Sequence, residues 1–175
     1  TSQWLKAAFW FWASLTRRGF RWAVLGAAFG LACTLAVLQA LAMRYPLYDV
    51  GLFHQILWGV SQGHGFVSTI SGAGDFLQDH LAPSIALVVP FFWLTGGAPW
   101  VLPIVHAGLL FGGIAAWVRL AERFPVPGGT RARADFRPVL AAAATLFALG
   151  FGSLWGNLRW GFHENAVSFC ALSWA

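Results

Sequence analysis

The sequence predicts an all-α, polytopic membrane protein: three full transmembrane helices, a truncated fourth, and interfacial or juxtamembrane helices. Hydrophobic residues make up 58% of the chain and charged residues only 10%, against about 25% charged residues in globular proteins. The 11 Trp and 16 Phe suit a chain that meets several membrane–water boundaries. Residues 22–43 are an uncharged run, and as a helix of about 33 Å they would cross a bilayer core of about 30 Å.

The positive charge of the chain is interpreted as a membrane feature. The formal net charge is +5, and the arginines cluster beside apolar runs. This pattern indicates topology and contact with anionic lipid headgroups, and we expect no nucleic-acid partner. Cys33 and Cys170 have neither a CxxC nor a metal-ligand spacing, so we interpret both as small apolar packing residues.

The first segments in order are an inner interfacial segment, residues 1–21, and the first span, residues 22–43. Residues 1–15 are rich in Trp and Phe but too short to span, which favours a helix lying on the inner leaflet. Residues 44–98 are predicted to form an outer loop. Within this loop, 52–60 and about 81–94 have the composition of short juxtamembrane helices.

The arginines decide how the apolar residues 84–118 are divided. Two short spans would place the five arginines of 119–137 outside, whereas a single span, 99–118, places them inside with Lys6 and the arginines of 17–21. The positive-inside rule favours the single span. Residues 119–138 then form an inner Arg-rich loop.

The remaining chain is predicted to hold a third span, residues 139–158, entered from Pro138, followed by an outer turn and the start of a fourth span in 159–175. Because the sequence stops inside an apolar stretch, we expect it to be part of a longer protein. Three GxxxG spacings fall in or at the spans and predict close helix contacts. The third is Gly152/Gly156; the glycines of the first two, which we single out for helix packing, are Gly26, Gly30, Gly108 and Gly112.

This topology predicts the cytoplasmic (inner) membrane of a bacterium, with the N-terminus cytoplasmic and the loop 44–98 outside. Most of the acidic residues and histidines then lie on the outer face, so a catalytic site is expected there. Asp49 is the sharpest candidate, because a carboxylate just past the end of a span is partly desolvated and suited to act as a general base. The alternative role is an N-cap of the short helix that follows.

Two acid–histidine pairs and two arginines are the other outer candidates. Asp79 with His80 and His163 with Glu164 stand at the starts of separate apolar segments. Together they could bind a divalent metal ion, through Asp79 and Glu164, or a phosphate-linked substrate; the alternative is polar residues that begin a helix. Arg44 and Arg159 could hold a lipid phosphate, or they could reach to the headgroups as interfacial arginines commonly do.

His106 lies inside the second span, where an imidazole needs a partner. We weigh three roles: a hydrogen bond to a neighbouring helix, a position facing the outer cavity, and ligation of a pigment or haem metal.

Three stretches, YDVGLFHQILWGVSQGHG, DHLAPSIALVVPFFWL and GFHENAVSF, resemble a family of uncharacterised bacterial polytopic membrane proteins. That family is in turn similar to the GT-C class of glycosyltransferases, which take a sugar from a polyprenyl-phosphate donor at the outer face. The resemblance covers most of this chain but only the N-terminal part of such an enzyme. It implies that Asp49 is the loop acid and that Asp79, His80, His163 and Glu164 line the same cavity.

Two functions are therefore predicted as alternatives. The first is the N-terminal part of a GT-C-like glycosyltransferase, an enzyme if the native protein is longer, with a polyprenyl-phosphate lipid as partner in the bilayer. The second is a non-catalytic accessory subunit of a larger photosynthetic or respiratory membrane complex, if the chain is complete at about 175 residues.

Overall fold

The computed structural model describes residues 3–4, 6, 10–11, 14, 16–45, 47–70, 74–79, 83–123, 130–150, 152–160, 162–163 and 165–175. Helices, turns and short connections make up these residues; the only β feature among them is an isolated bridge between Val67 and Asp75. The predicted all-α class is therefore confirmed. Most of residues 1–15, predicted to be interfacial, lies outside the described part.

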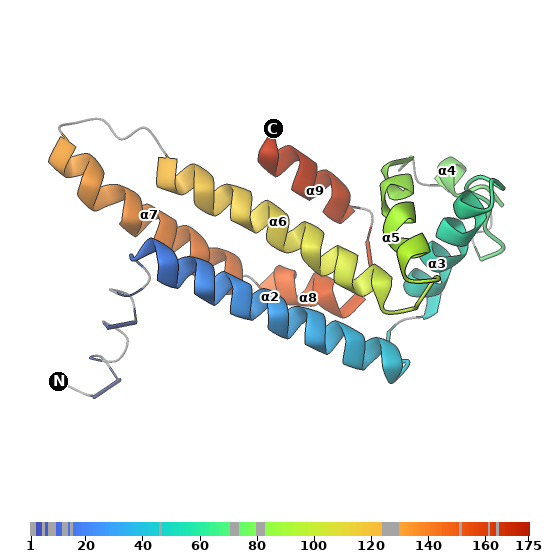
Figure 1. Cartoon of the computed structure of the whole chain (residues 1–175), viewed down its shortest axis with the longest axis horizontal. Coiled ribbons are helices and arrows are strands. Elements are labelled where there is room, and N and C mark those ends of the chain that lie inside the picture. Colours follow the sequence, from blue (N-terminus) through green and yellow to red (C-terminus); the bar gives the residue numbers. More distant parts are fainter. Residues whose placement is uncertain are drawn as a thin grey trace.

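Two helices of the described chain are long and apolar enough to cross a membrane: α2 (Arg18–Leu41) and α6 (Val101–Arg123). Each of these helices extends a few residues past the inner end of the span predicted for it: α2 begins before residue 22, and α6 ends after residue 118. Figure 1 shows α6 in the middle of the bundle, with α2, α7 and α9 packed along it. The buried fraction of the apolar window is 61% for α6 and 22% for α2, so α6 is the helix on which the bundle is built.

Two described helices cover the third predicted span, and residue 151 between them lies outside the described part. Helix α7 (Thr130–Gly150) begins nine residues before the predicted start and contains Pro138, and α8 (Gly152–Trp160) follows as a separate helix. The indole Nε1 of Trp155 donates a hydrogen bond to the Leu149 carbonyl at 2.8 Å, which satisfies one of the acceptors left open where α7 ends.

The early start of α7 also shortens the predicted inner loop. Helix α6 continues to Arg123, and α7 is already helical from Thr130, so only 124–129 of the predicted loop 119–138 lies outside the described part. The apolar part of α7, Phe136–Gly150, is shorter than a span. The number of spans therefore stays a prediction.

Residues 47–100 form a compact unit at one end of the bundle, the helical loop (Figure 1). It contains α3 (Leu47–Ser61), α4 (Phe76–Asp79), the 3₁₀ helix η1 (Pro83–Val88) and α5 (Val89–Leu94). A cluster of buried apolar side chains holds these elements together: Leu52, Phe53, Ile56, Leu57, Phe76, Ile85, Val88, Val89, Phe92, Val101, Leu102 and Phe162. Both predicted juxtamembrane helices thus have counterparts, and α3 begins five residues earlier than expected.

A tight turn closes the helical loop before α6. Gly97 has φ +75°, a left-handed conformation that favours glycine, and its N–H donates to the Phe92 carbonyl at 2.9 Å. The ring of His54 lies edge-on to Phe92 with centroids 4.9 Å apart, and its Nε2 donates to the Gly97 carbonyl at 2.7 Å. His54 therefore ties α3 to the end of α5.

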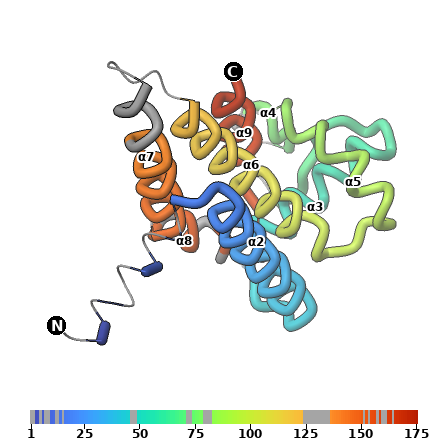
Figure 2. Tube along the Cα trace, turned by 60° about the vertical axis from the view of Figure 1, so that its left-hand side comes forward, coloured from blue at the N-terminus to red at the C-terminus, as the bar shows by residue number. Residues whose placement is uncertain are grey.

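Helix α9 (Asn165–Trp174) packs along α6 in the same direction as α6. Figure 2 shows it against α6 from a second angle. The closest approach is at Gly113, where a Cβ atom would fall inside the contact distance of the Phe169 ring. Trp174 Nε1 donates to the Gly112 carbonyl at 3.1 Å, and Trp117 Nε1 donates to Ser173 Oγ at 3.2 Å.

At the end of the bundle opposite the helical loop, ion pairs hold the helices together. We call this the arginine end. Arg21 is 2% exposed, and its guanidinium donates to Glu122 Oε1 at 2.7 Å and to the Thr16 carbonyl at 2.6 Å. The exposed Arg18 reaches the other carboxylate oxygen of Glu122 at 3.3 Å. The prediction that these arginines serve topology and headgroups missed this role: they join α2 to α6 through Glu122, an acid that the sequence analysis did not single out.

Candidate functional site at the loop end

Asp49 lies in the first turn of α3, directly after the turn that follows α2. Met43 adopts φ +49° in this turn, and the Arg44 N–H donates to the Gln39 carbonyl at 2.9 Å, so the chain leaves α2 sharply. Asp49 is the third residue of α3 and not its N-cap. The helix N-terminus still favours its negative charge, because the first N–H groups of a helix carry a partial positive charge.

The Asp49 side chain is half-buried. Within the described residues its carboxylate makes no hydrogen bond and no ion pair. The other described acid of the helical loop differs, since Asp75 Oδ1 accepts the Leu77 N–H at 3.0 Å and so begins α4. His64 stacks edge-on against Trp58, and His54 holds the turn at Gly97. Of these polar side chains, Asp49 is the one with no evident part in the fold.

His106 joins α6 to the connection between α8 and α9. It is 1% exposed, and its Nδ1 accepts the His163 backbone N–H at 3.0 Å. Phe162 packs beside it, with ring centroids 5.8 Å from His106 and 5.0 Å from Phe53 of α3. Of the three roles considered for His106, the structure shows a hydrogen bond, but it joins His106 to the connection before α9 and not to a neighbouring helix as predicted. The backbone of His163, and not a side chain, supplies the partner.

The remaining predicted residues are only partly within the described chain. Arg44 is exposed in the turn after α2. The side chains of Asp79 and Arg159, and all of His80 and Glu164, lie outside the described residues. The described part of the chain holds no group of three His, Cys, Asp or Glu side chains that could bind a metal ion. A divalent metal at Asp79 and Glu164 therefore stays a prediction.

The four glycines predicted for helix packing fall into two groups. A Cβ atom at Gly112 would meet the Cys170 sulfur of α9 at 3.2 Å, so this glycine does face a neighbouring helix. Gly26, Gly30 and Gly108 have no described atom within 4 Å of such a Cβ. The tightest contact of α6 is at Gly113, one residue outside the predicted spacing.

Tyr45 is a buried residue of this end that the sequence analysis did not single out. It is 8% exposed, and its hydroxyl finds no hydrogen-bond partner among the described residues. Burial raises the pKa of Tyr45 to about 12 from the ordinary value of 10.0. No sequence signal distinguishes it from Tyr48, since both are aromatic residues next to the end of a span.

We expect a spectrophotometric titration at 295 nm of the Tyr48→Phe variant to show the Tyr45 phenolate only near pH 12 in the folded protein. The Tyr45 hydroxyl keeps its proton in the folded state, whereas in the unfolded chain it loses the proton near pH 10. The free energy of unfolding therefore falls as the pH rises from 10 to 12. The denatured variant serves as the control and should titrate near 10. A folded midpoint near 10 would show that Tyr45 is accessible to water.

The two long apolar helices have the length and composition of membrane spans. Residues 41–173 match the profile of the family described as "Predicted membrane protein (DUF2079)", and the chain belongs to that family. No curated protein and no solved structure matches the chain. The membrane class that the sequence predicts is therefore shown.

Proposed function

We propose that this chain is the N-terminal part of a GT-C-like glycosyltransferase that acts at the outer face of the bacterial cytoplasmic membrane on a polyprenyl-phosphate-linked sugar. The observation that carries the proposal is Asp49, a half-buried carboxylate at the start of the first juxtamembrane helix. Its freedom from the described hydrogen bonds and ion pairs supports a chemical role. The three sequence stretches that resemble the uncharacterised family, and through it the GT-C class, support the choice of reaction.

In this reaction Asp49 acts as the general base. An acceptor hydroxyl oxygen attacks the anomeric carbon of the sugar, Asp49 takes the hydroxyl proton, and the bond from that carbon to the phosphate oxygen breaks. The polyprenyl phosphate leaves with the electron pair of that bond. Arg44 and Arg159, together with His80 and His163, are proposed to neutralise the phosphate charge that develops.

The Asp49→Asn variant of the full-length protein tests this role. We expect it to lower sugar transfer at least 100-fold, since positioned acid–base groups contribute about 10²- to 10⁴-fold. The assay measures transfer of radiolabelled sugar from a panel of polyprenyl-phosphate sugars in membrane vesicles. Asp75→Asn is the matched control: it makes the same chemical change in the same helical loop but keeps the oxygen that accepts the Leu77 N–H, so activity should stay within about twofold of wild type. Full activity in Asp49→Asn would remove the general-base role.

A further inference from the structure

Arg119 of α6 lies between two tryptophan rings at the arginine end. Its guanidinium carbon is 5.6 Å from the ring centroid of Trp22 in α2 and 5.3 Å from that of Trp174 in α9. A cation over the face of an indole ring is attracted by the negative charge of that face. Arg119 therefore contacts both neighbouring helices, and the two rings fix the position of its charged group.

The N–H groups of Arg119 have no acceptor in the described chain. Among the described residues this side chain makes no hydrogen bond and no ion pair, and the residue is exposed. Glu122 lies one turn further along α6, but its two carboxylate oxygens face Arg18 and Arg21. A guanidinium presents five N–H donors in a planar fork that fits phosphate oxygens. Arg119 is thus a positioned cation that is open to an external anion.

The surrounding charge favours an anion at this place. Helices α2 and α7 begin at the arginine end, and α6 ends there (Figure 1). The segments 17–21, 119–123 and 130–138 carry eight arginines but only two acids, Glu122 and Asp135. Such an excess of positive charge attracts anionic lipid headgroups. It also disfavours zwitterionic headgroups, because their ammonium groups would approach the same arginines.

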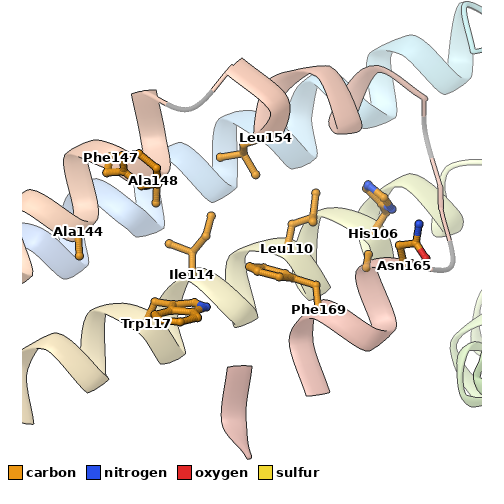
Figure 3. A pocket seen from close by; sticks show the side chains of 11 residues that line it. His106, Leu110, Ile114, Trp117, Ala144, Phe147, Ala148, Leu154, Asn165 and Phe169 are labelled. Carbon is orange, nitrogen blue, oxygen red and sulfur yellow. The ribbon is translucent and has the colours of Figure 1, made fainter. Parts of the chain in front are cut away.

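Tryptophans place Arg119 at the level of the headgroups. Trp117 precedes it by two residues, at the end of an apolar pocket that lies away from His106 (Figure 3). Trp117 and Trp174 are 55% and 52% exposed. Tryptophans of membrane proteins gather at the membrane–water interface, and α6 continues for only about 6 Å beyond Arg119. The anion nearest to this level of a membrane protein is a lipid phosphate.

We propose that Arg119 is the centre of a binding site for one anionic phospholipid, whose phosphate accepts hydrogen bonds from the guanidinium held by Trp22 and Trp174. Charge alone would make the exposed arginines of this end equivalent, whereas the two rings single out Arg119. A side chain that is already positioned loses less conformational freedom when it binds. One lipid is therefore bound more tightly than the general positive charge explains. The site lies at the opposite end of the bundle from Asp49 and does not depend on sugar transfer.

Native mass spectrometry of the delipidated full-length protein, titrated with palmitoyl-oleoyl phosphatidylglycerol, tests the proposal. In about 0.15 M ammonium acetate, exposed charges more than about 8 Å apart are largely screened. We expect Arg119→Gln to bind the first lipid at least about tenfold more weakly than wild type, because charged hydrogen bonds are lost. Arg123→Gln is the matched control, since it makes the same change one turn further along α6 at an exposed arginine with no described ring contact. Its affinity should stay within about threefold of wild type.

Arg119→Lys gives the decision if Arg119→Gln does not fold. Lysine keeps the positive charge but lacks the planar fork, so we expect binding about three- to tenfold weaker than in wild type. Palmitoyl-oleoyl phosphatidylcholine is the control lipid, because it has the same phosphate and the same chains without net charge. It should bind wild type at least about tenfold more weakly than phosphatidylglycerol.

Three results would overturn the proposal. Equal losses in Arg119→Gln and Arg123→Gln would mean that the charge of the arginine end acts as a whole. Equal affinity of wild type for the two lipids would exclude an anionic site. Wild-type affinity in Arg119→Gln or in Arg119→Lys would assign Arg119 to a contact within the protein. Asp49→Asn should leave lipid binding unchanged, so failure of the transferase proposal does not affect this test.

Discussion

Replacing Glu122 by glutamine is expected to lower the free energy of unfolding by about 3 kcal/mol, the lower end of the range for breaking a buried ion pair. The variant keeps the size of the side chain but removes the negative charge that faces Arg21. The Arg21 side chain is only 3% exposed and that of Glu122 13%, so water cannot readily replace the lost carboxylate. The lower end of the range applies because Glu122 is not completely buried.

Two further variants show whether the buried pair carries this effect. Arg18→Gln removes the outer arm of the same cluster, but the Arg18 side chain is 72% exposed, so the loss should stay below about 1 kcal/mol. The double variant Arg21→Met with Glu122→Leu replaces the pair by apolar side chains and should recover most of the stability lost in Glu122→Gln. Unfolding by SDS in mixed micelles, followed by circular dichroism, measures all three. Equal losses for Arg18→Gln and Glu122→Gln would contradict a buried latch between α2 and α6.

Replacing Gly113 by alanine is expected to destabilise the protein by about 1–3 kcal/mol, the usual range for an overpacked interior. The added methyl group would overlap the Phe169 ring of α9. Either Phe169 leaves its position or α9 moves away from α6, and both responses reduce the packing between these helices. The same micelle titration measures the change.

Gly108→Ala is the matched control, since Gly108 is also in α6 and no described atom lies within 4 Å of the added methyl group. Alanine is the better helix former, so this variant should be unchanged or more stable by up to about 1 kcal/mol. The two substitutions are chemically identical, and only the one at Gly113 is predicted to destabilise the protein. Loss of stability at Gly108 and none at Gly113 would mean that α9 packs on another face of α6.

The sequence was a good guide to the helices whose length and composition stand out. Helices α2 and α6 could be predicted because a helix that crosses a membrane needs a long run of apolar residues. Both runs are visible in the sequence. The juxtamembrane helices α3 and α5 could also be expected, because glycines and prolines separate them.

The side-chain pairs were harder to predict because they depend on the rotation of one helix against another. Arg21 and Glu122 are 101 positions apart, and His106 and His163 are 57 positions apart. Nothing local marks either pair, although Glu122 could have been noticed as an acid in an arginine-rich region. The glycine spacing pointed correctly to Gly112, which faces α9, but it missed the tighter contact at the next residue, Gly113. Whether Asp49 is catalytic stays a prediction for the transfer assay.

The hydrogen bond between His106 and the His163 backbone also sets an order for biosynthesis. A ribosome adds about 5 to 20 residues each second, so His106 leaves the ribosome roughly 3 to 11 seconds before residue 163 does. During this interval the imidazole of a newly inserted α6 has to be satisfied by water, lipid or the insertion machinery. The central helix of the bundle is thus completed by a late segment of the chain, and α6 reaches its final environment only after α8 and the start of α9 have been made.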